Sequence, residues 1–192
     1  CRICHYGLLL LIALLFVIIQ VNPKSVVTFD KTLTPEKIAV REMKLDFSYD
    51  FNITMGNFPI PKSRTSYMCK GSKFPTESAK HFIKSTPIID TTHIVHHIII
   101  YQCSEPIPEE WFDCNPMPSS CVNILAVWAI GGGNVELPPE AGAKIGRGTD
   151  TIYIVLQVHY DNYLEEEGLI DNSGLSLSLT EKLRQHDAGV LI

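Results

Sequence analysis

The amino-acid sequence predicts an all-β protein, an antiparallel β-sandwich or jelly roll, preceded by a hydrophobic targeting helix at the N-terminus. Several short segments alternate apolar and polar residues with a period of two, which is typical of half-buried strands. Glycine and proline clusters separate these segments, as in the turns of antiparallel sheets. No segment shows the long 3.6-residue periodicity of an amphipathic helix, so the sandwich or barrel classes are favoured.

Size and composition favour one globular domain with a sizeable core. The chain has 192 residues, of which 45% are hydrophobic and 19% charged, so disorder is not expected. The formal net charge is −5 and no Lys/Arg cluster is present. Nucleic acid is therefore not an expected partner, because binding the phosphate backbone needs a basic surface.

The N-terminus is interpreted as a targeting segment, residues 1–23. Arg2 and His5 precede an uncharged apolar run at residues 7–21, which suits a signal peptide better than a full membrane span. Residues 20–23 offer no A-x-A-like cleavage site, so an uncleaved signal anchor, holding the chain to a membrane through residues 7–21, is the alternative. Both interpretations direct the rest of the chain to the secretory pathway, as a secreted or lumenal protein.

Cysteine usage and a sequon agree with that compartment. An even number of cysteines in a secreted domain predicts two disulfides, and four cysteines allow three pairings. The sequon Asn52-Ile53-Thr54 predicts N-glycosylation at Asn52. The chain has six cysteines, and the four outside the targeting segment are Cys69, Cys103, Cys114 and Cys121.

In chain order, residues 24–44 are charged and are interpreted as a linker, and the domain is expected to cover residues 45–192. The segment 78–90 could be a strand or irregular, because Pro87 excludes a helix there. The Gly- and Pro-rich stretch 131–148 predicts turns around one short strand. We expect further strands at residues 45–55, 65–74, 93–103, 122–130, 149–162 and 175–183.

Three histidines on two predicted strands form a candidate metal site: His96, His97 and His159. Neutral imidazole is a common ligand of copper and zinc. Neighbours on a regular strand point to opposite faces, so His96 and His97 share an ion only if their strand is bulged or the pair lies at its end. Gln157 lies on the face of His159 and could support it from the second coordination shell. The alternative is a set of hydrogen-bonded core or rim histidines.

Other polar residues are expected to be solvated. His81 and His186 lie in polar or loop-like sequence, and residues 165–167 form an acidic run typical of an exposed loop. Trp111 and Trp128 are interpreted as packing anchors.

Four separated motifs resemble the copper type II, ascorbate-dependent monooxygenase family. The first is HHIIIYQC at residues 96–103, and the second is VWAIGGGNVELPPEAGAKIG at 127–146. The third motif is similar to the segment that carries the family's third histidine, and it consists of IVLQVHYDN at 154–162 and EEGLIDNSGLSL at 166–177. TSYMC at 65–69 is similar to the segment with its first cysteine. The resemblance covers roughly residues 45–192 and implies the N-terminal one of two jelly-roll β-sandwich domains.

The resemblance also implies the chemistry of the site. His96, His97 and His159 would bind the electron-transfer copper, with Cys69 paired to Cys114 and Cys103 to Cys121. In the family, ascorbate reduces copper, and the electron passes to a second copper, where O2 is activated and a C–H bond is hydroxylated.

Departures from the family pattern limit these expectations. The second copper uses a His-x-His pair and a methionine from a following domain, and this sequence has no His-x-His. We therefore expect the chain alone to bind one copper, to have no catalytic residues of its own and not to hydroxylate.

The residues and the layout of the chain favour different branches of the family. The DBH-like branch, with a phenylethylamine-type amine as substrate, is favoured by the segments HYDN, EEGLIDNSG and DAGV. The lack of an extra N-terminal domain instead favours the branch that hydroxylates glycine-extended peptides. A non-catalytic secreted copper-binding module is the second hypothesis, and a structural β-sandwich with incidental histidines is the third.

Overall fold

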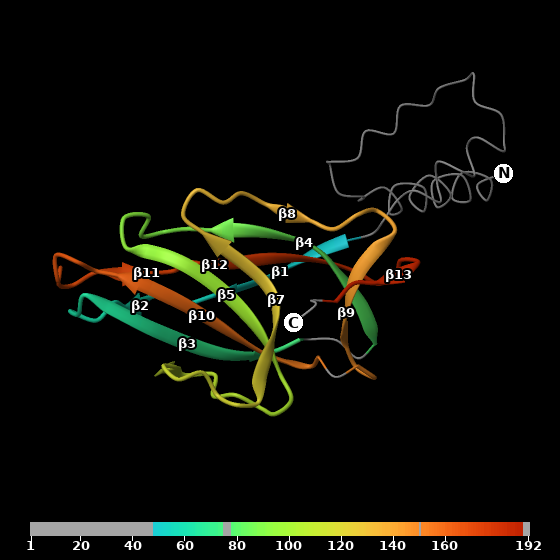
Figure 1. The fold of residues 1–192 in the computed structure, drawn as a ribbon, viewed down its shortest axis with the longest axis horizontal. Coiled ribbons are helices and arrows are strands. Elements are labelled where there is room, and N and C mark those ends of the chain that lie inside the picture. Colours follow the sequence, from blue (N-terminus) through green and yellow to red (C-terminus); the bar gives the residue numbers. More distant parts are fainter. Residues whose placement is uncertain (1–47, 75–77, 150, 190–192) are drawn as a thin grey trace, which may run out of the picture. The chain divides into compact units, whose positions relative to one another are not determined.

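The computed structural model describes residues 48–74, 78–149 and 151–189, and these residues form strands and loops (Figure 1). The prediction of an all-β protein is confirmed for this part of the chain. The predicted targeting helix at residues 1–23 and the linker at 24–44 lie outside the described residues. No helix within the described ranges is long and apolar enough to cross a membrane.

Two main sheets make up the domain (Figure 1). The first has the order β1-β12-β4-β9-β13, with β8 paired to β4, and the second has the order β6-β3-β10-β5-β7. Pairing is antiparallel except between β13 and β9, and β11 with β2 forms a small third sheet. The strands of the first sheet are β1 (Ser48–Thr54), β4 (Ala79–Ile88), β8 (Val135–Glu136), β9 (Ala141–Gly146), β12 (Gly174–Thr180) and β13 (His186–Asp187). The others are β2 (Phe58–Pro59), β3 (Thr65–Lys73), β5 (Val95–Cys103), β6 (Trp111–Asp113), β7 (Cys121–Ala129), β10 (Tyr153–Asp161) and β11 (Ile170–Asp171).

The core lies between the two sheets, because one cluster of buried side chains contains residues from both. Leu177 on β12 and Leu156 on β10 are completely buried members of this cluster. Each fully buried aliphatic side chain of this kind contributes about 1.5–3 kcal/mol to folding. The period-two alternation seen in the sequence therefore orients one face of each sheet inward, as a β-sandwich requires. The finer jelly-roll topology stays a prediction.

Two disulfides tie the long loop between β5 and β7 to the second sheet. Cys69 of β3 bonds Cys114, which follows β6, and Cys103 bonds Cys121 across the paired ends of β5 and β7. The four cysteines and Val155 form a second buried cluster. These are the two pairings that the family resemblance implies, and they explain how a loop rich in proline is held in place.

The segment at residues 78–90 is a strand, β4, although it contains Pro87. Pro87 pairs with Leu175 of β12 on one side, whereas β8 and β9 pair only with earlier residues of β4. The missing N–H of Pro87 therefore faces an edge with no partner strand, where proline is tolerated. The stretch 131–148 contains two strands, β8 and β9, where one was expected.

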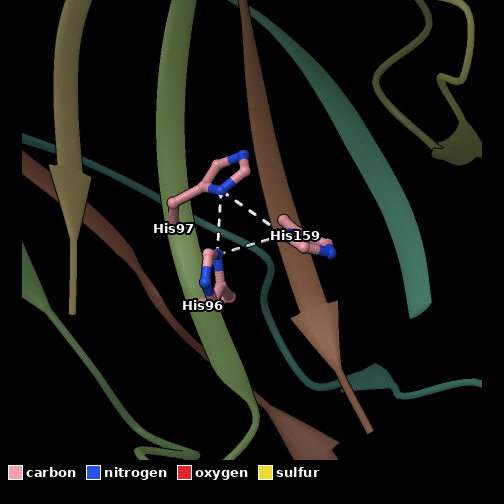
Figure 2. A group of neighbouring side chains, drawn as sticks. All are labelled: His96, His97 and His159. Atoms are coloured by element: carbon pink, nitrogen blue, oxygen red, sulfur yellow. Dashed lines mark hydrogen bonds between the residues drawn. The ribbon is translucent and has the colours of Figure 1, made fainter. Parts of the chain in front are cut away.

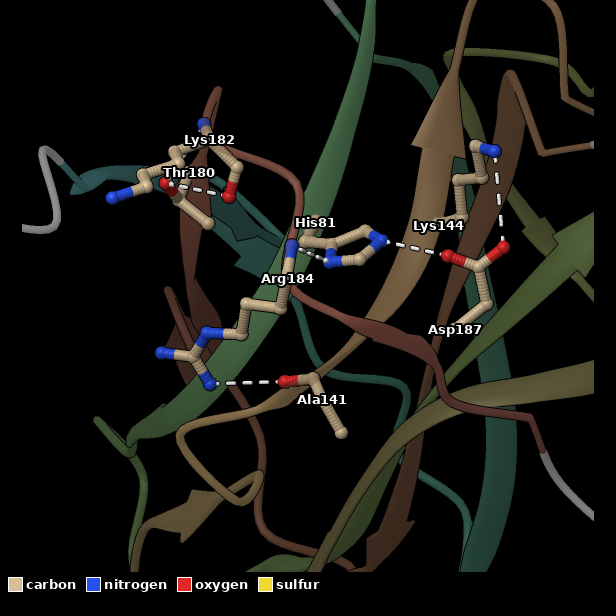
Figure 3. Close-up of polar contacts among 7 residues, drawn as sticks. All are labelled: His81, Ala141, Lys144, Thr180, Lys182, Arg184 and Asp187. Atoms are coloured by element: carbon tan, nitrogen blue, oxygen red, sulfur yellow. Dashed lines mark hydrogen bonds and ion pairs between the residues drawn. The ribbon is translucent and has the colours of Figure 1, made fainter.

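The prediction of a solvated His81 is wrong, because this side chain is completely buried on β4 (Figure 3). The backbone N–H of Arg184 donates to His81 Nδ1 at 2.9 Å. The proton must then reside on Nε2, which donates to Asp187 Oδ1 at 2.9 Å. Gly142 leaves room for the ring, since a Cβ there would lie 2.5 Å from His81 Cβ. His81 thus joins the C-terminal segment to the first sheet, a contact between residues about 100 positions apart that sequence neighbours do not reveal.

Candidate metal centre

The three candidate histidines come together because β5 and β10 are neighbours in the second sheet. His159 of β10 lies opposite His97 of β5, but the next residue, Tyr160, lies opposite Val95. His96 is therefore the extra residue of a β-bulge, and its side chain turns toward the same site as that of His97 (Figure 2). This is the local irregularity that the sequence analysis required for the two adjacent histidines to share an ion.

The Nδ1 atoms of the three rings converge (Figure 2). They are separated by 3.2 Å between His96 and His97, 3.3 Å between His159 and His96, and 3.4 Å between His159 and His97. The centre of such a near-equilateral triangle lies about 1.9 Å from each nitrogen, close to the usual metal–imidazole distance of about 2.0 Å. The three histidines are thus a group that could hold a metal ion, and three ligands leave a further coordination position open.

Burial favours the neutral form of two of the three rings, His97 and His159. Desolvation lowers the pKa of His97, and the neighbouring His96 lowers it further. Desolvation also lowers the pKa of His159, with His97 and His96 acting in the same direction and Asp161 opposing them. Both pKa values fall from the usual 6.5, so both rings are neutral at pH 7. Neutral imidazole is the form that binds a metal, and protons compete less for such ligands.

The ring of His159 is held on its face and on its outer edge. Tyr67 of β3, which lies opposite His159, stacks on it with ring centroids 4.2 Å apart and an interplanar angle of 1°. The hydroxyl oxygen of Thr65 lies 2.8 Å from His159 Nε2, the nitrogen that points away from the cluster. Neither residue was selected from the sequence. The register of β3 against β10 is the only signal that could have identified them, and this register is a property of the folded sheet.

Gln157, the predicted second-shell residue, is buried on β10. Its amide nitrogen donates to the sulfur of Cys114 at 3.6 Å, so its hydrogen bond connects the strand to a disulfide. A second-shell role for Gln157 stays a prediction. Thr65 is the residue whose hydrogen bond to a ring nitrogen of the cluster is observed.

A buried polar network holds the end of β10 beside the cluster. The hydroxyl of Tyr160 donates to Asp171 Oδ2 at 2.8 Å, and Ser173 Oγ donates to Asp171 Oδ1 at 2.7 Å. The backbone N–H of Thr91 donates to the same carboxylate. Burial and the carboxylate of Asp171 raise the pKa of Tyr160, so its hydroxyl stays protonated and remains a donor. The strand that carries His159 is therefore fixed at its end to β11.

The acidic run at residues 165–167 lies in a loop that side-chain contacts hold in place. Glu165 and Glu167 are exposed, as predicted, and Glu166 is half-buried. The buried side chain of Asn162 donates to the carbonyl of Glu166 and accepts from its N–H. The three glutamates then pair with Arg64, His93 and Lys62. Exposed pairs of this kind contribute at most about 1 kcal/mol each, so Asn162 is the main determinant of the loop conformation. His186 is exposed, as predicted.

The fold and the cluster together define a class: a β-sandwich protein with an all-histidine site able to hold one metal ion. Residues 51–167 match the model of a family described as copper type II ascorbate-dependent monooxygenase, N-terminal domain. The chain belongs to this family, which confirms the resemblance found in the sequence motifs.

Relatives agree with the assignment. The chain is 40% identical over 173 residues to human DBH-like monooxygenase protein 1, a match that covers 84% of this chain and 28% of that protein. It is 34% identical to human dopamine beta-hydroxylase over 146 residues and 34% identical to tyramine beta-hydroxylase of Caenorhabditis briggsae over 144 residues. These two matches cover 70% and 69% of this chain, and 24% of each relative. The chain thus spans about a quarter of the length of the relatives that it matches.

Proposed function

We propose that this chain is the copper-binding, electron-transfer part of a copper- and ascorbate-dependent monooxygenase, and that it holds one copper ion through His96, His97 and His159. The observation that carries this proposal is the convergence of three Nδ1 atoms to within 3.4 Å of one another. Three neutral nitrogen ligands without a carboxylate or thiolate suit copper in both of its common oxidation states.

Copper bound there would supply one-electron chemistry, with ascorbate as the reductant and a second copper site as the acceptor. The protein side chains provide the conditions for this role. The low pKa values of His97 and His159 keep the donor atoms free of protons at pH 7. The exposed side chain of His96 leaves the cluster open to solvent, so a small reductant can approach it.

We further propose that the complete protein hydroxylates a C–H bond of a phenylethylamine-type amine with O2. The support is the similarity of the chain to dopamine beta-hydroxylase and tyramine beta-hydroxylase, which are named for amine substrates. The family resemblance implies a second copper site with a His-x-His pair for the hydroxylation, and the 192 residues contain no such pair. We propose the electron-supplying role for the three histidines of this chain and the C–H chemistry for the complete protein.

Metal analysis combined with EPR spectroscopy tests the electron-transfer role. We expect about one copper per chain after loading and dialysis, because three ligands make one site. The Cu(II) signal should disappear when ascorbate is added without oxygen. A chain that retains zinc and rejects copper, or a Cu(II) signal that ascorbate leaves unchanged, would contradict the proposal.

A separate experiment tests the substrate. The longest natural product of the gene is incubated with tyramine or with a glycine-extended peptide, and hydroxylation of the peptide alone would exclude the amine.

We also propose that the protein is made in the secretory pathway and carries an N-glycan at Asn52. Asn52 is exposed on β1, at the edge of the first sheet, where a glycan has room. Two disulfides agree with an oxidising compartment. When the chain is secreted from animal cells, N-glycosidase treatment should reduce its apparent mass, and Asn52→Gln should remove that difference. An untreated wild-type chain of unglycosylated mass would refute the prediction.

A further inference from the structure

His159 differs from the other two histidines of the cluster in how it is positioned. His96 and His97 are neighbours on β5, and the bulge orients them together. His159 comes alone from β10, so the third ligand depends on the orientation of a single ring. An imidazole ring can rotate by half a turn about its bond to Cβ, which would move Nδ1 out of the cluster.

Thr65 contacts Nε2, a ring atom whose position differs between these two orientations. Its hydroxyl oxygen lies 2.8 Å from Nε2, on the side of the ring opposite the converging Nδ1 atoms. Thr65 is the first residue of β3 and pairs with Asp161, two positions beyond His159 on the adjacent strand. Side chains in this diagonal relation on one sheet face are within reach of each other. Among the residues that the structure describes, Nε2 of His96 and Nε2 of His97 have no comparable hydrogen bond.

The hydrogen bond is compatible with the tautomer of His159 that binds a metal through Nδ1. A threonine hydroxyl can donate or accept, so it can serve either neutral form of imidazole. Once Nδ1 binds an ion through its lone pair, however, the ring proton must lie on Nε2. Nε2–H then donates to Thr65 Oγ1, and this bond is present only when Nδ1 faces the cluster.

Tyr67 leaves this choice open. It stacks on the face of the His159 ring with the two planes nearly parallel. A half-turn about the bond to Cβ turns the ring over but returns it to the same plane, so stacking restrains the plane of the ring but not the direction of Nδ1. The direction is restrained by the hydroxyl of Thr65.

We propose that Thr65 is a positioning residue for the metal centre, whose hydroxyl holds Nε2 of His159 and so directs Nδ1 to the ion. The inference rests on the proposed function, since it concerns the copper that the three histidines would bind. Loss of an outer hydrogen-bond partner of a metal ligand typically weakens metal binding by about 10- to 100-fold. We expect the lower end, about tenfold, because His159 is only partly buried and water can replace the hydroxyl in part.

The test compares Thr65→Val, which removes the hydroxyl but keeps the shape, with Thr65→Ser, which keeps the hydroxyl. Cu(I) affinity is measured on the full chain by competition with the chelator bicinchoninate, and the Cu(II) EPR spectrum is recorded for each variant. Thr65→Val should bind Cu(I) about tenfold more weakly and change the EPR parameters, whereas Thr65→Ser should restore both. Thr86→Val, on β4 of the other sheet, is the matched control and should bind copper like the wild-type chain.

The melting temperature of each metal-free variant separates positioning from folding. We expect Thr65→Val to melt close to the wild-type chain, because exposed substitutions usually change stability by about 0.5 kcal/mol or less. Wild-type affinity and spectrum in Thr65→Val would overturn the inference while leaving the proposed function intact. A Thr65→Ser variant as weak as Thr65→Val would also overturn it. If the wild-type chain itself bound no copper, the proposed function would fail instead, and this inference with it.

Discussion

Replacing His159 by alanine is expected to remove most of the copper from the chain. His159 is the only ligand contributed by β10, and without it the site keeps two nitrogens from adjacent residues of one strand. A loss of one of three ligands should weaken binding by more than the roughly 10- to 100-fold expected when an outer-shell partner is lost. Copper is measured by atomic absorption after dialysis against a competing chelator, and the wild-type chain should retain about one ion, as a single three-ligand site requires.

His186→Ala is the matched control for this experiment. His186 is an exposed histidine on β13 of the first sheet, and the hydrogen bond of its backbone to Glu140 does not involve the imidazole. This variant should keep the copper of the wild-type chain. Full copper occupancy in His159→Ala would show that the three histidines are not the site. Equal losses in both variants would point to a general effect of removing histidines, such as adventitious surface binding.

Reduction of the disulfides is expected to lower the melting temperature of the domain strongly. The bridge from Cys69 to Cys114 closes a loop with a sequence separation of 45, and the bridge from Cys103 to Cys121 closes one of 18. In the chain-entropy model each contributes about 3–4 kcal/mol by restricting the unfolded state. Together they are comparable to the total stability of a typical domain, about 5–15 kcal/mol. Thermal unfolding of the copper-free chain, followed by circular dichroism with and without reductant, measures the effect.

Paired serine variants assign the effect to each bridge. Replacing Cys103 and Cys121 together removes the bridge at the β5–β7 ends, and replacing Cys69 and Cys114 together removes the one that contacts Gln157. The first pair should leave the metal cluster intact, because it lies at the opposite end of β5 from His96 and His97. A melting temperature that does not change on reduction would mean that neither bridge stabilises the fold.

Much of the fold is predictable because strand formation depends on local patterns. Alternation along β10 places Ile154, Leu156 and Val158 on the core face, and all three are completely buried. In β12 the leucines alternate with serines, and the leucines face the core. Polar surroundings are less informative. His81 lies between Lys80 and Phe82 in a segment that could be strand or irregular, and its burial depends on Arg184 and Asp187, which are far away in the sequence.

The candidate metal centre likewise has some features that the sequence predicts and others that only the folded sheet determines. Its three imidazoles and their placement at the ends of two strands follow from residue types and short-range periodicity. The bulge at His96, the pairing of His97 with His159 and the contacts of Thr65 and Tyr67 with His159 exist only in the assembled sheet. Strand neighbours and register are long-range properties, set by how two sheets bury their apolar faces together. Local sequence therefore specifies which donor atoms are available, and only tertiary packing brings three of them to within 3.4 Å of one another.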